Sequence, residues 1–189
     1  MAMPAVARTD WTVDMLDALP DDGQRYELID GELFVSPSPS NLHQFLVTEL
    51  IVRLHSYLRA SAVGRVVTSP SDVRRPDRTR NRVQPDVFVF RRRDKEAFDS
   101  PFDFSDLLLV IEVVSPSGSS YDYQVKRRLY LGSGIPEYWV VNPDARNISR
   151  WVGADDPGQV LSEKIAWHPD GMTSELVIDI NELFSDAVN

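Results

Sequence analysis

Leu107–Ser117 reads LLLVIEVVSPS, and this stretch decides the expected fold because it places one carboxylate, Glu112, inside an apolar run. A short β-branched run bounded by Ser-Pro-Ser is typical of a central strand that is covered on both faces. An unpaired carboxylate in such a strand would destabilise the folded state by roughly several kcal/mol. Glu112 therefore needs a partner, for which a metal ion, a cationic side chain and a shared proton are the candidates.

Composition narrows the class of protein. The chain has 189 residues, of which 42% are hydrophobic, so we expect a single domain over residues 1–189. It contains no cysteine, which excludes disulfides, thiolate zinc sites and thiol nucleophiles. The N-terminal segment lacks the apolar core of a signal peptide, and no segment reaches the roughly 18 apolar residues of a membrane span. We therefore expect a soluble, cytoplasmic protein that does not enter a membrane.

Charge is distributed unevenly along the chain. The formal net charge is −9, which argues against non-specific binding of nucleic acid over the whole surface. Most of the Lys and Arg residues nevertheless lie between Arg74 and Arg128. They form either a local basic face or ordinary solvated charges, and charge alone leaves both interpretations open.

The N-terminal half is expected to form a helix, a hairpin and a second helix. Thr9–Leu19 has the pattern of a short helix. Asp30-Gly31 lies between two short strand-like runs and predicts a β-hairpin over Tyr26–Val35. Apolar residues at three- and four-residue spacings predict an amphipathic helix from residue 41 to about residue 62.

Interior strands are expected to follow. Arg65–Val73 and Val83–Phe90 predict two strands, joined by an exposed connection over Arg74–Arg82. A helix over Tyr121–Gly132 separates the opening strand from another at Glu137–Val141, and this spacing predicts a crossover between parallel strands. The tail is expected to add antiparallel strands, at Ile148–Trp151, Ser162–Trp167 and Glu175–Leu183.

Three polar side chains follow the order of a metal-dependent phosphodiesterase site. Asp86 begins one interior strand, Glu112 lies on the next, and Lys126 lies on the helix after it. Carboxylate oxygens select Mg2+ or Mn2+. Such an ion would stabilise charge on a phosphate and lower the pKa of an attacking water, and an ammonium group can assist both. Taken singly, an Asp after Pro85 is more typical of a turn or strand end, and a Lys is usually solvated.

Several motifs occur in a fixed order between about Leu19 and Trp151. They are Tyr26–Leu33 (YELIDGEL), His43, Pro85-Asp86, Glu112–Ser117, the spaced set Asp122, Lys126 and Tyr130, and Gly134–Trp139 (GIPEYW). This set resembles the bacterial Uma-type restriction endonuclease family of the PD-(D/E)XK nuclease superfamily. The resemblance implies an α/β, restriction-endonuclease-like fold with a mixed central sheet flanked by helices, an N-terminal hairpin, C-terminal antiparallel strands and a core of about residues 25–151.

The resemblance also implies roles for individual residues. Asp86 and Glu112 would be metal ligands, and the backbone carbonyl of Val113 would complete the metal shell. The superfamily pattern has its lysine two residues after the acidic residue, where this chain has Val114. The resemblance implies that Lys126 replaces it as the third catalytic residue, and its long side chain permits this from a helix packed on the sheet.

Three further residues are candidates for a supporting role. Asp122 lies four residues before Lys126, so an ordinary ion pair on one helical face is the alternative for both. Glu27 resembles the hairpin glutamate of the family, and is either an extra ligand, a contact behind the ligands, or a residue that covers a strand edge. His43 contacts either a phosphate or water, or a backbone group at the start of its helix.

Together these features predict a divalent-metal-dependent endonuclease that hydrolyses DNA, with Mg2+ or Mn2+ as its cofactor. The alternative is a catalytically inactive module of the same fold that binds nucleic acid or protein, which the net negative charge and Val114 favour. An enzyme acting on RNA is a third interpretation. The resemblance implies a homodimer that cuts two strands, although no feature of the sequence itself fixes the oligomeric state.

Overall fold

A six-stranded sheet lies at the centre of the computed structural model, which describes residues 10–36, 38–75, 78–92, 101–114 and 119–188. The strand order is β10-β9-β8-β7-β6-β3, and only β7 and β8 pair in parallel within it. The predicted crossover and the predicted mixed sheet are therefore confirmed. Residues 115–117, at the end of the opening stretch, lie outside the described residues. The bounds are β3 (Gly64–Thr68), β6 (Val87–Arg91), β7 (Leu107–Val113), β8 (Glu137–Asn142), β9 (Asn147–Val152) and β10 (Gln159–Leu161).

A second sheet of four strands has the order β2-β1-β5-β4. Its hairpin, β1 and β2, is the predicted one, and Asp30 and Gly31 turn the chain with φ of 51° and 84°. Positive φ at both central residues is the requirement of a two-residue type I′ turn. A separate two-stranded sheet lies near the C-terminus. The bounds are β1 (Arg25–Ile29), β2 (Glu32–Ser36), β4 (Val73–Arg75), β5 (Arg78–Val83), β11 (Lys164–Trp167) and β12 (Leu176–Asp179).

The exposed connection predicted over Arg74–Arg82 is wrong, because β4 and β5 pair there as an antiparallel ribbon. Asn81 and Val83 are buried, whereas Arg82 between them is half-buried and Arg80 before them is exposed. This alternation is that of a strand with one covered face. The side chain of Asn81 accepts a hydrogen bond from the Asp30 N–H at 2.9 Å and so joins the ribbon to the hairpin turn. The arginines of Arg74–Arg82 made this segment look solvent-exposed in the sequence, so its alternation of buried and exposed side chains was not predicted.

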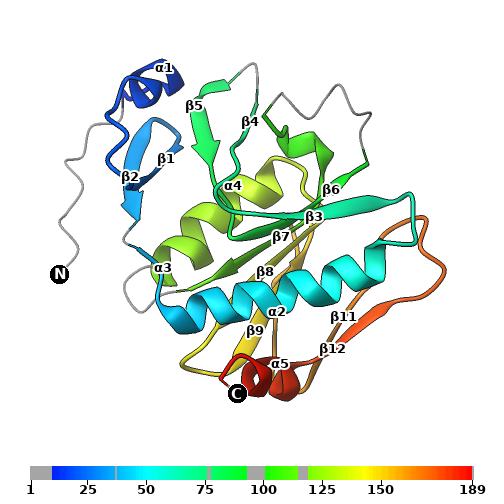
Figure 1. Cartoon of the computed structure of the whole chain (residues 1–189). Coiled ribbons are helices and arrows are strands. Elements are labelled where there is room, and N and C mark those ends of the chain that lie inside the picture. The colour runs from blue at the N-terminus through cyan, green and yellow to red at the C-terminus, as the bar shows by residue number, and fades with distance from the viewer. Residues whose placement is uncertain (1–9, 37, 76–77, 93–100, 115–118, 189) are drawn as a thin grey trace.

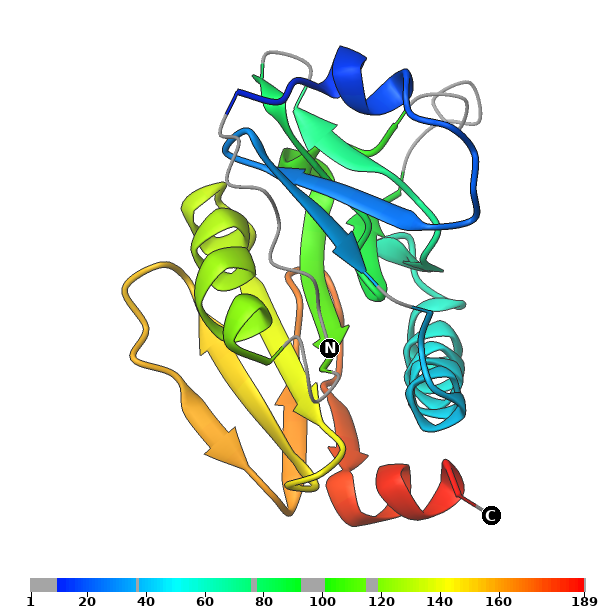
Figure 2. The same cartoon turned by 90° about the vertical axis from the view of Figure 1, so that its left-hand side faces the viewer.

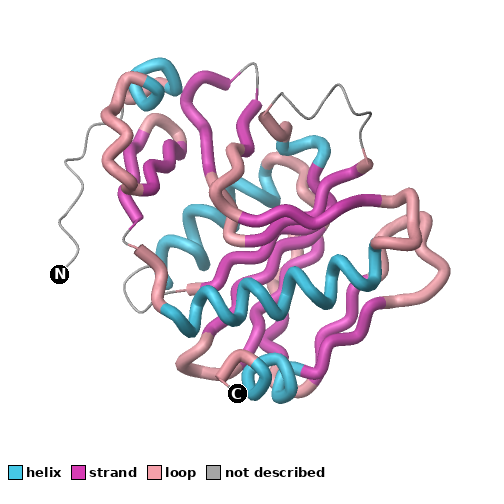
Figure 3. Tube along the Cα trace, viewed as in Figure 1, coloured by secondary structure: helices cyan, strands magenta, loops and turns pink. Residues whose placement is uncertain are grey.

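Helices cover both faces of the central sheet (Figures 1 and 2). Figure 3 shows the strands passing between α2 (Asn41–Leu58) and the helical crossover formed by α3 (Ser119–Tyr121), η3 (Asp122–Lys126) and α4 (Arg127–Gly132). α2 ends about one turn before its predicted end. Within the described residues, no helix combines the length and apolar character needed to cross a membrane.

Three short helices complete the fold. The predicted N-terminal helix is confirmed as α1 (Val13–Asp17), and η2 (Phe104–Asp106) precedes β7. The strand predicted over Glu175–Leu183 is wrong in its second half, which is α5 (Ile180–Asp186). Asp179 is the reason, since its side chain accepts a hydrogen bond from the Glu182 N–H at 3.0 Å and caps this helix.

Alternation along β7 distributes its side chains between two apolar cores. All seven residues of the strand are buried, as predicted for a strand covered on both faces. Leu109 and Ile111 pack with α2 and α5, whereas Val110 packs with α4 and the second sheet. Glu112 is two residues beyond Val110, so it points toward α4 and the second sheet.

Candidate active site

Asp86 and Glu112 lie opposite each other, where β6 begins and β7 ends. The register pairs Val87 with Ile111, so the two carboxylates occupy the next pair of positions. Both are buried, with 5% and 1% of their surface exposed. Like charges in directly opposite positions repel each other. The structure thus brings the two predicted metal ligands together in an arrangement that requires positive charge nearby.

Lys126 supplies positive charge from a π-helical turn, η3. Its Nζ lies 2.9 Å from Oε1 of Glu112, 3.1 Å from Oε2 of Glu27 and 3.7 Å from Oδ1 of Asp122. The pair with Asp122, which was the ordinary alternative, is therefore the longest of the three contacts. Val114, at the position of the superfamily lysine, is buried among apolar side chains of the α4 side. The ammonium group reaches the strand end from the crossover helix instead.

Arg25 supplies the second positive charge, and no motif in the sequence pointed to it. Its Nη1 donates a hydrogen bond to Oδ1 of Asp86 at 2.8 Å. Its Nη2 lies 3.5 Å from Oε1 of Glu27 and 3.9 Å from Oε2 of Glu112. Arg25 is two residues before Glu27 on β1, so their side chains share a face. That spacing is the one sequence signal that could have associated Arg25 with the site.

Glu27 and His43 approach the acidic pair, Asp86 and Glu112, from different elements. Glu27 is fully buried, and its Oε1 accepts a hydrogen bond from the Gln84 N–H at 2.9 Å. His43, in the first turn of α2, places Nε2 3.5 Å from Oδ1 of Asp86. The N–H of His43 also donates to Oγ of Ser40, which caps the helix. The structure therefore places His43 at the site and at the helix start together.

The orientation of the acidic pair is fixed by two further hydrogen bonds. The Val113 N–H donates to Oδ2 of Asp86 at 2.9 Å. The Tyr130 hydroxyl donates to Oε1 of Glu112 at 2.7 Å. The Asp86 N–H lies 3.4 Å from Oε2 of Glu112 and joins the two residues directly. Each carboxylate is thus held by both backbone and side-chain donors.

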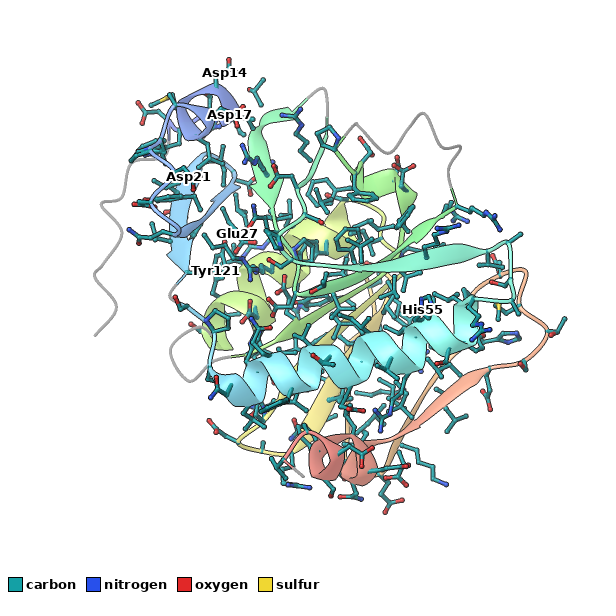
Figure 4. The ribbon with its side chains drawn as sticks, viewed as in Figure 1. Asp14, Asp17, Asp21, Glu27, His55 and Tyr121 are labelled. Atoms are coloured by element: carbon teal, nitrogen blue, oxygen red, sulfur yellow. The ribbon has the colours of Figure 1, made fainter. Side chains whose placement is uncertain are left out.

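Figure 4 separates this site from other titratable side chains. Glu27 and Tyr121 lie near each other between the second sheet and the crossover helix. His55 lies toward the other end of α2, and a separate acidic group surrounds α1: Asp14, Asp17 and Asp21.

Burial and charge shift the pKa values of the site in different directions. Burial alone would raise the pKa of Asp86, but hydrogen bonding and the positive charges around it hold that pKa below its usual range. Burial raises the pKa of Glu112 to about 8, against the opposing charge of Lys126. Burial likewise raises the pKa of Asp122 to about 6. Asp86 is therefore the stronger acid of the pair, and burial makes Glu112 the weaker one.

The site has the composition expected of a divalent-metal site. It carries a formal charge of −2, from four carboxylates and two cationic side chains: Glu27, Asp86, Glu112 and Asp122 against Arg25 and Lys126. Hard oxygen donors with excess negative charge suit Mg2+ or Mn2+. The charge and the donor type therefore both fit one divalent ion.

Buried polar atoms without hydrogen-bond partners also indicate that the site can hold a divalent ion. Within the described part of the chain, Arg25 Nε, Glu27 Oε2 and Tyr121 Oη are buried and have no hydrogen-bond partner. The contact of Glu27 Oε2 with Lys126 is an ion pair without hydrogen-bond alignment. Buried atoms of this kind are expected where an ion or water belongs. In the conformation described, no three His, Cys, Asp or Glu side chains among the described residues are arranged around a common metal position.

The sequence of the chain matches a model of the Uma2 family, described as "Putative restriction endonuclease", over residues 13–180. The chain belongs to the Uma2 family. Its structure is similar to the crystal structure of a "putative nuclease belonging to DUF820" from Anabaena variabilis ATCC 29413, with a TM-score of 0.78 and 21% sequence identity. That similarity covers 94% of this chain and 99% of the other. No curated protein matches the sequence.

For this Uma2-family chain, the family and the restriction-endonuclease-like fold predicted from sequence are both confirmed. Membership in the family supports a nuclease function and a nucleic acid as the substrate. The roles of Asp86, Glu112 and Lys126 stay predictions, to which the structure adds their proximity.

Proposed function

We propose that this Uma2-family chain is a divalent-metal-dependent endonuclease that hydrolyses phosphodiester bonds of DNA. Asp86 and Glu112 hold Mg2+ or Mn2+ together with the backbone carbonyl of Val113, and Lys126 contacts the scissile phosphate. The observation that carries the proposal is the 2.9 Å contact between Lys126 Nζ and Glu112 Oε1, beside a second carboxylate on the adjacent strand. In metal-assisted hydrolysis of a phosphodiester, a bound ion and a cationic side chain stabilise the charge that develops on the phosphate.

Each side chain has a task that follows from its surroundings. Asp86 has a lowered pKa and is a carboxylate at neutral pH. Burial would lower the pKa of Lys126, but the charges of Glu112 and Glu27 raise it. Lys126 therefore stays protonated, and its ammonium group donates a hydrogen bond to a phosphate oxygen. Tyr130 orients Glu112 through its hydroxyl. A divalent ion, when bound, supplies a Lewis acid and lowers the pKa of the attacking water.

Three residues support these groups in the proposal. Glu27 and Asp122 flank the ammonium of Lys126, at 3.1 and 3.7 Å, and keep it at the strand end. His43 lies 3.5 Å from Asp86 and limits the positions that this carboxylate can adopt. The proposed activity is assigned to one nuclease-like domain, with DNA as its partner.

Plasmid cleavage in the presence of Mg2+ or Mn2+ tests the proposal. Wild type is expected to nick or linearise the plasmid, whereas Asp86→Asn and Lys126→Ala are expected to lose at least about 100-fold in rate, the order of effect of removing one group that stabilises the transition state. Lys164→Ala, an exposed lysine on β11, is the matched control and should cleave like wild type. Equal rates in all four proteins would contradict the assignment.

A catalytically inactive module that binds nucleic acid or protein is the second candidate function. The observation that favours it is the internal compensation of the acidic pair by Arg25 and Lys126. Salt-dependent DNA binding without cleavage under Mg2+ or Mn2+ would support this candidate. Cleavage that Asp86→Asn abolishes would exclude it, and a parallel assay on RNA separates the two nucleic acids.

A further inference from the structure

Arg25 occupies the space between the oxygens that a metal ion would need. Oδ2 of Asp86 already accepts the Val113 N–H at 2.9 Å, and Oε1 of Glu112 already accepts from Lys126 at 2.9 Å. The other oxygen of each carboxylate faces the guanidinium group of Arg25, at 2.8 Å for Asp86 Oδ1 and 3.9 Å for Glu112 Oε2. The guanidinium therefore stands where an ion shared by the two carboxylates would bind.

A divalent ion and this guanidinium cannot share that position. Oxygen ligands approach Mg2+ to about 2.1 Å, so an ion on Oδ1 of Asp86 would lie against the Arg25 nitrogen that is bonded to the same oxygen. Arginine stays protonated in proteins and cannot relieve the repulsion by losing a proton. Its side chain is 23% exposed and so borders the solvent, and its outward rotation would break its contacts with Asp86 and with the Gln84 carbonyl.

We propose that Arg25 is an exchangeable cation, which neutralises Asp86 and Glu112 in the metal-free protein, yields that position to a divalent ion and then binds a phosphate of the DNA. The inference rests on the proposed nuclease function and adds a substrate contact to it. A guanidinium group presents paired N–H donors that match two phosphate oxygens. Because β1 holds the backbone of Arg25, the exchange involves rotation of the side chain only.

Calorimetry with Mn2+ tests the exchange without relying on cleavage. Arg25→Gln removes the competing charge, so its affinity for Mn2+ is expected to rise about tenfold or more over that of wild type. Arg150→Gln is the matched control. Arg150 is also partly exposed, at 26%, and pairs with a buried carboxylate, Glu137, but it lies outside the acidic site. Its affinity for Mn2+ should equal that of wild type.

Thermal unfolding and cleavage give two further measurements. In EDTA, Arg25→Gln should unfold at a lower temperature than wild type, and Mn2+ should raise its midpoint by more than it raises that of wild type. At saturating Mn2+ the variant should cleave DNA at least about tenfold more slowly, because the phosphate contact is lost. Tighter metal binding combined with slower cleavage distinguishes the exchange from a merely structural role, which would weaken both. If Arg25→Gln does not fold, Arg25→Lys replaces it. This variant retains a cation, so its Mn2+ affinity and cleavage rate should change in the same directions by smaller factors.

The outcomes separate this inference from the proposed function. If wild type binds Mn2+ and cleaves DNA but Arg25→Gln binds Mn2+ no more tightly, the exchange is overturned and the nuclease assignment stands. If neither protein binds Mn2+, the metal site itself is overturned, and both proposals fail with it. If Arg25→Gln alone binds Mn2+, Arg25 blocks the position in wild type and does not yield it, so the exchange is overturned.

Discussion

Lys126 compensates two buried carboxylates, so its removal should affect stability as well as cleavage. Its Nζ lies within 3.1 Å of both Glu112 and Glu27. Removing one partner of a buried ion pair costs about 3–5 kcal/mol, because the other charge is left unpaired. Lys126→Met is therefore expected to lower the free energy of unfolding by about that amount, measured by urea denaturation in EDTA.

Lys164→Met is the control for this measurement, since its lysine is exposed and its effect should stay within about 0.5 kcal/mol. The double variant Glu112→Gln with Lys126→Met should lose less than the sum of the two single losses, because each change removes the partner that the other leaves unpaired. Strict additivity would mean that the 2.9 Å contact does not stabilise the protein.

Tyr130 provides a smaller and separate test at the same carboxylate. Tyr130→Phe deletes the hydroxyl that donates to Glu112 at 2.7 Å and leaves the ring in its apolar surroundings. The expected loss is about 1–3 kcal/mol in the free energy of unfolding. Tyr57→Phe, whose hydroxyl donates at the surface to a backbone carbonyl, should lose less. Equal losses would show that the contact with Glu112 has no special weight.

Single residues of the site differed in how far the sequence could predict them. Asp86 and Glu112 were predictable because local chemistry marks both: a Pro-Asp pair before a strand, and a charge within an apolar run. Lys126 followed from the family resemblance. The position of Arg25 was not predictable, because Arg25 and Asp86 are 61 residues apart in the sequence and meet only in the folded chain.

At the scale of elements, the approach of β3 to β6 depends on a glycine. A Cβ atom built on Gly64 would lie 2.6 Å from the carbonyl oxygen of Phe90, across the pair of strands. Gly64→Ala must therefore displace one strand, and should lower the free energy of unfolding by about 1–3 kcal/mol. Urea denaturation measures the change.

Gly132→Ala is the matched substitution for that experiment. No atom lies within 4 Å of the Cβ position of Gly132, which ends α4. Alanine is the better helix former by about 1 kcal/mol, so this variant should be neutral or slightly more stable. A loss at Gly132 as large as that at Gly64 would contradict the explanation by close approach.

The elements that the sequence predicted correctly are those with a strong local signal. The Asp30-Gly31 turn specifies the β1–β2 hairpin. Apolar periodicity specifies the helix α2, and a continuous apolar run specifies the buried strand β7. The β4–β5 ribbon was not predicted, because arginine-rich strands gain their burial from partners elsewhere in the chain. α5 was not predicted because its first turn continues the apolar pattern of β12, and only the cap at Asp179 separates them.

At the scale of the whole molecule, α5 connects the C-terminus to the main core. Ile180, Leu183 and Phe184 are almost fully buried, in the same cluster as the apolar face of α2. Burial of each such side chain contributes about 1.5–3 kcal/mol, and folded domains are stable by only about 5–15 kcal/mol in total. Truncation after Asp179 should therefore abolish cooperative thermal unfolding, followed by circular dichroism.

A shorter truncation controls for the loss of chain length. Val188 is 65% exposed, so ending the chain at Ala187 should leave the unfolding temperature nearly unchanged. A stable, cooperatively folded protein ending at Asp179 would mean that the core beneath α5 closes without it.

The π-helical turn over Asp122–Lys126 makes the geometry of the site sensitive to the length of the chain. A π turn contains more residues than an α turn, so this segment carries extra backbone between Asp122 and α4. Deleting one residue there would restore α-helical geometry and rotate the preceding side chains by about 100° relative to α4. The alignment of α3 with Lys126 and α4 therefore depends on the number of residues in this turn as well as on their identity.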